Sequence, residues 1–178
     1  MAAEGAEAPV RLASDAALET FVHQHYDRLL GLARLVCRDT ADAADAVQIG
    51  LEQAWRNRAS LREQERLRPW VDRIVTREAV RISKRRRSWL SRLMPATPEV
   101  GWIEPADGRA PEPANYAALK AAYLRLSPEQ RAVVALHMHM GYTVAETAQL
   151  VDAPEETVRS RLRLAKDKLR RELEETRP

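Results

Sequence analysis

Basic side chains near the C-terminal end of the sequence are spaced like residues on one face of a helix. Arg159, Arg163, Lys166 and Arg170 follow one another at intervals of four, three and four residues, and Ser160 lies at the start of this row. Cations on such a face neutralise phosphates, and side chains near the start of a recognition helix reach base edges. A charged row on an ordinary solvated helix is the alternative, so the surrounding elements decide between the two.

The elements around this row predict a helix-turn-helix unit. Ser127 and Pro128 form a helix start signal, and the apolar helix that follows them stops at Gly141. A short helix over residues 143–150 is then separated by a tight turn from a long basic helix that begins near Glu155. Two helices joined in this way, with the second one basic, fit the major groove of duplex DNA. The pattern therefore favours DNA binding.

A second basic row is predicted on a helix that runs from about residue 69 to residue 87. The row comprises Arg73, Arg77, Arg81 and Lys84, and Trp70 begins the helix next to it. An aromatic ring beside cations suits a strand whose bases are unstacked, because rings can hold exposed bases. The alternative is that Trp70 belongs to the core and that the arginines are merely solvated.

The helix before this one has a different character. Asp42, Asp45, Gln48 and Glu52 form a polar and mostly negative face, while Val47, Leu51, Ala54 and Trp55 form an apolar stripe. On a protein that binds nucleic acid, an exposed acidic face suits a protein partner better than DNA. Ordinary solubility also produces such faces, and the residues alone favour that simpler interpretation.

Composition and charge narrow the class of protein. The 178 residues are 45% hydrophobic and only 5% aromatic, and the absence of alternating strand-like runs predicts an all-α fold. The net charge of +3 conceals a strongly basic segment, since residues 56–92 contain 13 Lys and Arg against 4 acids. The single Cys37 excludes an internal disulfide and predicts a packed thiol in a reducing compartment. With no apolar run that could span a bilayer and no signal peptide, we expect a cytoplasmic protein with no membrane insertion.

The pattern divides the chain into two small helical domains. We expect a loose N-terminal tail over 1–17, a first domain over 18–93, a Pro-rich acidic linker over 94–116 and a second domain over 117–175. No cofactor is predicted. His137 and His139 are the only metal-like pair, and their i, i+2 spacing directs them to different helix faces, so no metal site is predicted either.

Over about residues 21–173, the chain resembles the extracytoplasmic-function group of bacterial sigma-70-type initiation factors. The resemblance is carried by residues 26–30, 42–48, 68–74, 126–131 and 157–162. It implies a sigma-2-like domain and a sigma-4-like helix-turn-helix domain. It also implies partners: the RNA polymerase core, through its β′ clamp helices and β flap, promoter DNA and an anti-sigma factor. The function implied is promoter-specific initiation for a stress or envelope-type regulon, without enzymatic activity.

The resemblance also assigns roles to the residues. Binding of the polymerase core is expected from Asp42, Asp45, Val47, Gln48, Leu51 and Glu52. Binding of the −10 element is expected from Trp70, Arg73, Arg77, Arg81 and Lys84. Binding of the −35 element is expected from Thr157, Arg159, Ser160, Arg163 and Lys166.

Several residues depart from the family pattern. Ile49 and Gly50 stand where Glu and Thr are usual, Arg77 where Asn is common, and Leu164 where an Arg often contacts DNA. These departures bear on core affinity and promoter preference.

The alternative function is a stand-alone helix-turn-helix regulator that has lost core binding. An enzyme acting on DNA is disfavoured, because the acids are scattered over solvated faces.

Overall fold

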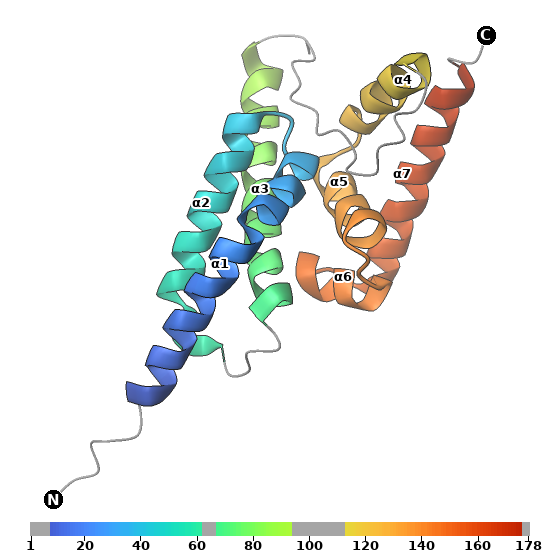
Figure 1. The fold of residues 1–178 in the computed structure, drawn as a ribbon. Coiled ribbons are helices and arrows are strands. Elements are labelled where there is room, and N and C mark those ends of the chain that lie inside the picture. The colour runs from blue at the N-terminus through green and yellow to red at the C-terminus, as the bar shows by residue number, and fades with distance from the viewer. Residues whose placement is uncertain (1–7, 62–66, 94–112, 176–178) are drawn as a thin grey trace, which may run out of the picture.

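The computed structural model describes residues 8–61, 67–93 and 113–175, and the described part consists of helices and the turns that join them. We call the first group of helices the N-terminal bundle and the second the C-terminal bundle. The N-terminal bundle contains α1 (Ala8–Val36), α2 (Thr40–Arg56), the short 3₁₀ turn η1 (Arg58–Ser60) and α3 (Leu67–Leu93). The C-terminal bundle contains α4 (Pro113–Leu124), α5 (Pro128–Val134), the π-helical turn η3 (Ala135–His139), α6 (Val144–Val151) and α7 (Glu155–Glu175). Figure 1 shows the two bundles side by side, and the predicted all-α class is confirmed.

Local capping interactions explain where several helices begin. The side chain of Asp39 accepts hydrogen bonds from the backbone N–H groups of Ala41 and Asp42 at the start of α2. Ser127 opens α5 and Thr143 opens α6, each through a capping box with the side chain three residues later. Such caps satisfy donors that the first helical turn leaves unpaired. The start signal that the sequence predicted at Ser127 and Pro128 is therefore confirmed.

Three helix boundaries differ from the expectation. Helix α1 begins at Ala8, so residues 8–17 are helical where a loose tail was expected. The alanines of this segment favour helix, and Pro9 lies in the first turn, where proline is tolerated. Helix α3 continues to Leu93, and α4 begins at Pro113 rather than after the predicted linker. Trp102, a notable residue of that linker, lies outside the described residues.

Close packing joins the helices of the N-terminal bundle. Gly50 of α2 lies against Val75 of α3, and a Cβ on Gly50 would lie 3.0 Å from the Val75 Cγ2 atom and 3.2 Å from its Cα. The glycine that departs from the family pattern therefore lets two helices approach closely. The core of this bundle includes Leu32, Val47 and Val71, all fully buried.

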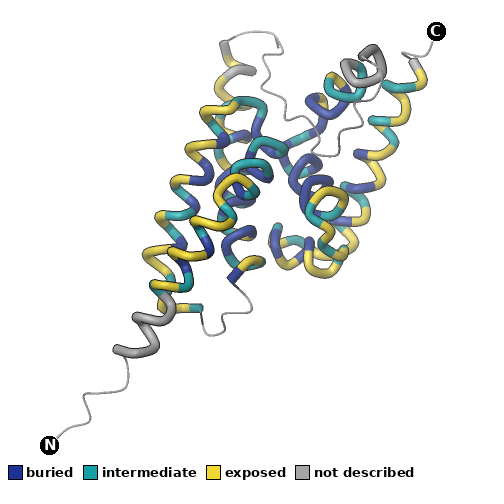
Figure 2. The backbone as a smooth tube through the Cα atoms, in the orientation of Figure 1, coloured by how far each residue is buried: buried dark blue, intermediate teal, exposed yellow. Residues whose placement is uncertain are grey.

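The C-terminal bundle packs onto the N-terminal one. Its own core gathers around Val133, Val158 and Ala165. Leu136 and Leu150, however, belong to the same buried cluster as the core of α1, α2 and α3. Figure 2 shows buried backbone continuing from one bundle to the other. The helices of the described part are too short or too polar to cross a membrane.

Candidate nucleic-acid interface

The turn between α6 and α7 builds the predicted helix-turn-helix. Asp152 ends α6 in the left-handed conformation, with φ of 54°. Asp adopts this conformation more readily than most residues other than glycine, so it can replace the usual turn glycine. Ala148 is buried in α6, and Val158 and Leu162 are buried in α7, which holds the two helices together. The two helices of the predicted helix-turn-helix are therefore packed together through a small residue of α6 and apolar residues of α7.

The basic row of α7 faces solvent. Arg159, Arg163 and Lys166 are exposed, and Thr157 and Ser160 are partly exposed near the start of the helix. Arg159 donates to a Glu155 carboxylate oxygen at 2.6 Å. An exposed ion pair of this kind contributes little to stability, so Arg159 can exchange the carboxylate for a phosphate or a base. All five residues predicted to bind the −35 element thus lie within the N-terminal half of α7 up to its middle and keep exposed surface.

The side chains along the basic row of α3 are less exposed to solvent than the sequence suggested. Arg73, Arg81 and Lys84 are exposed, whereas Arg77 is partly buried. Trp70 is also partly buried and packs against the core of the N-terminal bundle. It therefore supports the core and retains some exposed surface, and its contact with the unstacked strand stays a prediction.

Two cations of this row contact acids of the C-terminal bundle. The Arg77 guanidinium lies 3.0 Å from a carboxylate oxygen of Asp152, in the turn of the helix-turn-helix. The Lys84 ammonium lies 2.6 Å from a carboxylate oxygen of Glu129, in the first turn of α5. The face of α3 that was predicted to hold DNA therefore meets the C-terminal bundle.

A buried carboxylate links the bundles next to this row. Asp72 of α3 has no exposed surface and accepts two hydrogen bonds from Arg28 of α1, at 2.6 and 2.9 Å. It also accepts a hydrogen bond of 2.6 Å from the Tyr142 hydroxyl, which precedes α6. Burial and the neighbouring Asp72 carboxylate raise the pKa of Tyr142, so its phenol remains a donor at ordinary pH. Sequence reasoning missed this contact, because nothing local pairs these residues.

The C-terminal end of α1 receives further donors from the C-terminal bundle. Arg131 of α5 is buried and donates to the Val36 and Leu126 carbonyl oxygens, each at 2.7 Å. The Tyr123 hydroxyl of α4 donates to the Leu35 carbonyl at 3.0 Å. The last backbone carbonyl groups of a helix lack hydrogen-bond partners within that helix. Arg131 and Tyr123 therefore satisfy the Val36 and Leu35 carbonyl oxygens at the end of α1. Burial lowers the pKa of Arg131 to about 10.

The predicted polymerase-binding residues of α2 divide into exposed and buried groups. Asp45, Gln48 and Glu52 are exposed and Leu51 is partly exposed. Val47, however, is fully buried and packs in the core, so it offers no exposed surface to the partner that was predicted for it. Its position on the inner face of an amphipathic helix explains the difference, because that face turns toward α1 and α3.

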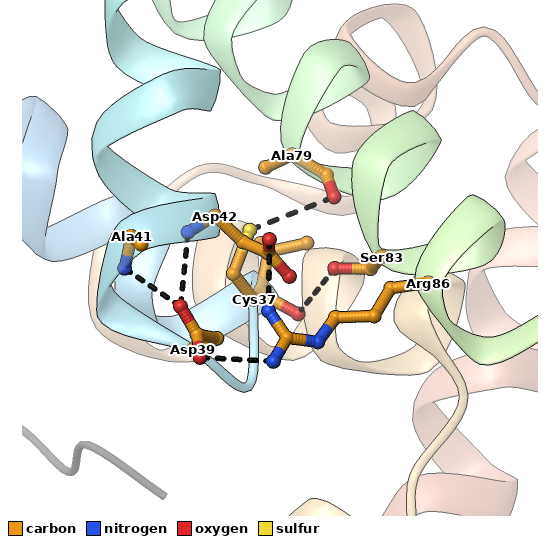
Figure 3. A network of polar contacts seen from close by, with 8 residues as sticks. Cys37, Asp39, Ala41, Asp42, Ala79, Ser83 and Arg86 are labelled. Atoms are coloured by element: carbon orange, nitrogen blue, oxygen red, sulfur yellow. Dashed lines mark hydrogen bonds and ion pairs between the residues drawn. The ribbon is translucent and has the colours of Figure 1, made fainter. Parts of the chain in front are cut away.

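Asp42 is also less accessible than expected. Figure 3 shows Arg86 of α3 reaching across to Asp39 and Asp42 at the start of α2. The two guanidinium-to-carboxylate distances are 3.1 and 3.0 Å. Burial raises the pKa of Asp42, although Arg86 opposes this effect. The same view shows the buried Cys37 thiol directed at the Ala79 carbonyl, 3.7 Å away, which confirms the predicted packed thiol.

An apolar groove lies between α1 and α2. It is lined by Tyr26, Leu51 and Trp55, with Gln48 and Glu52 beside them. Tyr26 is 43% exposed and Trp55 is 39% exposed, although Trp55 was predicted to lie on a packed stripe. Trp55 directly follows the buried Ala54, so it falls at the edge of that stripe rather than inside it.

The Arg58 guanidinium lies 4.4 Å from the centre of a Trp55 ring, which supports the ring from one side. Tyr26, Trp55 and Arg56, which also lines the groove, were missing from the predicted site. Large exposed aromatics of this kind mark surfaces that bind other proteins.

Two family models match the chain. "Sigma-70 region 2" matches residues 21–90, and "Sigma-70, region 4" matches residues 116–169. The first match covers most of the N-terminal bundle, and the second covers most of the C-terminal one.

The chain is also similar in sequence to known proteins. The chain is 31% identical to "ECF RNA polymerase sigma factor SigM" of Mycobacterium tuberculosis over 155 residues, which are 87% of this chain and 76% of the relative. It is 28% identical to "RNA polymerase sigma-E factor" of Streptomyces coelicolor over 156 residues, covering 87% and 85%.

Solved structures of similar fold include the sigma factor RpoE of Bartonella quintana, in complex with the anti-sigma factor NepR. The TM-score is 0.68, the sequence identity is 22%, and the match covers 88% of this chain and 96% of the other. CnrH, in complex with the cytosolic domain of CnrY, matches with a TM-score of 0.59 and 20% identity, covering 92% and 96%.

Proposed function

Because the chain belongs to the extracytoplasmic-function group of the sigma-70 family, we propose that it binds bacterial RNA polymerase core and directs initiation at specific promoters. The observation that carries this function is the match of both sigma-70 regions, in chain order, to the two helical bundles. The relatives are themselves named RNA polymerase sigma factors, which disfavours the stand-alone regulator. A factor of this kind selects promoters and leaves the chemistry of RNA synthesis to the polymerase, so the chain is not an enzyme.

The groove between α1 and α2 is the proposed contact with the core. Its aromatic residues Tyr26 and Trp55 offer apolar area, and exposed Gln48, Glu52 and Arg56 provide a polar rim in which Arg56 lies 3.5 Å from the Glu52 carboxylate. A groove of this composition suits an amphipathic helix with polar residues at its edge. The β′ clamp helices, which the family resemblance implies, are the proposed occupant, and the β flap is the proposed contact of the C-terminal bundle.

Promoter DNA is the proposed ligand of the two basic rows. On α7, Arg159, Ser160 and Arg163 would read the −35 duplex, since they share the exposed start of a helix in a helix-turn-helix. On α3, Trp70 and Arg73 would hold the unstacked −10 strand by stacking and by phosphate contact. Two modest sites on one chain bind promoter DNA more tightly together than either does alone.

The remaining partners and the location follow from the family. Bacterial polymerase works in the cytoplasm, which is therefore the proposed location. An anti-sigma partner is proposed by analogy with the RpoE relative, whose structure contains the anti-sigma factor NepR.

Association with core polymerase tests this function. The labelled chain is titrated with core in a fluorescence anisotropy assay, and Trp55→Ala is compared with Trp89→Ala, which removes a tryptophan that is exposed elsewhere. We expect Trp55→Ala to weaken binding by about 30-fold, because a central aromatic at an interface contributes roughly 2 kcal/mol. We expect little effect from Trp89→Ala. No association of the unmodified chain with core would overturn the proposed function, and equal effects of both variants would overturn the proposed groove.

A further inference from the structure

One large apolar side chain lies exposed on the basic helix of the helix-turn-helix. Leu164 of α7 is 46% exposed, whereas Leu162, two residues earlier, is buried in the core of the C-terminal bundle. The side chains around Leu164 are polar or cationic, since Arg163 and Lys168 are exposed and Ser160 is partly exposed. A single exposed leucine needs no explanation on most protein surfaces. Here, however, it lies among side chains that are predicted to contact DNA.

Helical spacing puts Leu164 on the same outward face as Ser160. The two residues are four apart in one continuous helix, so they are separated by about 40° around its axis and about 6 Å along it. Val158 and Ala165 are buried on the side that faces α5 and α6. Figure 1 shows α7 at the edge of the C-terminal bundle. The outward side of the second helix, near its start, is the part of a helix-turn-helix that enters the major groove.

An apolar side chain in the major groove finds one apolar group on the base edges. Thymine presents its C5 methyl group there, whereas the other three bases present hydrogen-bond donors and acceptors. We propose that Leu164 packs against the methyl group of a thymine in the upstream promoter element and makes thymine the preferred base at that position. The inference rests on the proposed function, because it names the base chemistry that the −35 site recognises.

The surroundings of Leu164 favour DNA over a protein as its partner. An apolar protein surface that covered Leu164 would also take the neighbouring Arg163 and Lys168 away from water, which is unfavourable without counter-charges. Duplex DNA offers phosphates to those cations and a methyl group to the leucine. One ligand therefore satisfies both the charged and the apolar side chains of this face.

The size of the effect follows from one methyl group. Replacing a thymidine by deoxyuridine removes the C5 methyl group and leaves the hydrogen-bonding groups of the base unchanged. Burial of a methyl-sized group changes a binding constant by about fourfold. We therefore expect the unmodified chain to bind about fourfold more weakly when the contacted thymidine is replaced by deoxyuridine.

Three variants separate Leu164 from apolar surface in general. Leu164→Ala removes the side chain beyond Cβ at an exposed helical position, where alanine favours the helix. Leu164→Met keeps a flexible apolar side chain of similar volume. As the matched control, Met138→Ala removes an apolar side chain that is 58% exposed on η3, outside the two helices of the helix-turn-helix.

The experiment has two steps and uses the full chain bound to core polymerase. In the first step, the complex selects binding sites from a pool of randomised DNA duplexes, and the selected sequences define the upstream element. In the second step, each thymidine of that element is replaced singly by deoxyuridine, and competition binding gives the affinity. We expect one replacement to weaken binding about fourfold for the unmodified chain, Leu164→Met and Met138→Ala. The same replacement should have no effect on Leu164→Ala.

Contrary results refute either the inference or the proposed function. An upstream element in which no deoxyuridine weakens binding overturns the inference. A loss that persists unchanged in Leu164→Ala also overturns it, because another side chain then contacts the methyl group. A loss that disappears in Met138→Ala as well would show a general effect of apolar surface and would overturn it too. In these cases the chain still binds core and selects DNA, so the proposed function stands. A chain that selects no sequence together with core refutes the proposed function, and the inference fails with it.

Discussion

The Arg28–Asp72 pair makes a sharp prediction about stability. Arg28 keeps 21% of its side-chain surface exposed, whereas Asp72 keeps none. Removal of one member of a buried pair costs about 3–5 kcal/mol, mostly because the remaining charge stays buried without a partner. Arg28→Met leaves the fully buried Asp72 carboxylate without a charged partner and, among the described residues, with the Tyr142 hydroxyl as its remaining side-chain donor, so we expect a loss of about 4 kcal/mol. Asp72→Asn leaves the more accessible Arg28 guanidinium without its carboxylate partner, and we expect a loss of about 3 kcal/mol in the free energy of unfolding.

Urea unfolding followed by circular dichroism measures both losses. With a slope of about 2 kcal/mol/M, the midpoint should fall by about 2 M for Arg28→Met and by about 1.5 M for Asp72→Asn. The double variant should lose less than the sum of the two, because the second change no longer strands a charge. As a control, Arg56→Met breaks an exposed pair with Glu52, 3.5 Å apart, and should cost under about 0.5 kcal/mol. A loss of less than about 1 kcal/mol for Arg28→Met, or the reverse order of the two variants, would refute the reasoning.

Three further predictions test other parts of the molecule. Gly50→Ala puts a Cβ 3.0 Å from the Val75 side chain. Although alanine has the better helix propensity, we expect the free energy of unfolding in urea to fall by about 1 kcal/mol. A more stable variant would contradict this packing. Burial raises the pKa of Cys37 to about 11. At about pH 8 the native chain should therefore react with a thiol reagent at least about 100-fold more slowly than the urea-unfolded chain. Equal rates would show that the thiol is accessible in the native chain. Arg163→Ala should weaken duplex binding and lower the salt slope by about 1, whereas an unchanged slope would mean that Arg163 does not contact a phosphate.

Features encoded within a few residues were predictable. The capping residue Ser127 opens α5 as expected, and Asp39 and Thr143 cap α2 and α6 by the same local rule, because a cap needs only neighbours in sequence. Asp152 adopts the left-handed conformation that its place in the turn requires. The basic row of α7 also follows from periodicity alone, and its members are accessible as predicted.

Features that depend on which helices meet were not predictable from a single sequence. Val47 and Trp55 lie on the same predicted stripe, yet one is fully buried and the other 39% exposed, because Val47 faces α1 and α3 whereas Trp55 falls at the edge of the stripe. The Tyr142–Asp72 contact joins residues 70 positions apart. Periodicity identifies a helix face but does not identify what covers it. The pairing of α3 with the C-terminal bundle therefore required the structure.

Run-off transcription tests the central claim most directly. Core polymerase free of other sigma factors is incubated with the purified chain and fragmented genomic DNA, and the transcripts are sequenced. We predict discrete transcripts that require this chain and share one promoter pattern upstream of their start sites, with Arg73→Ala and Arg163→Ala each reducing their yield. If the polymerase remains silent while the chain alone still binds duplex DNA, the protein is a stand-alone regulator and its assignment as an initiation factor is wrong.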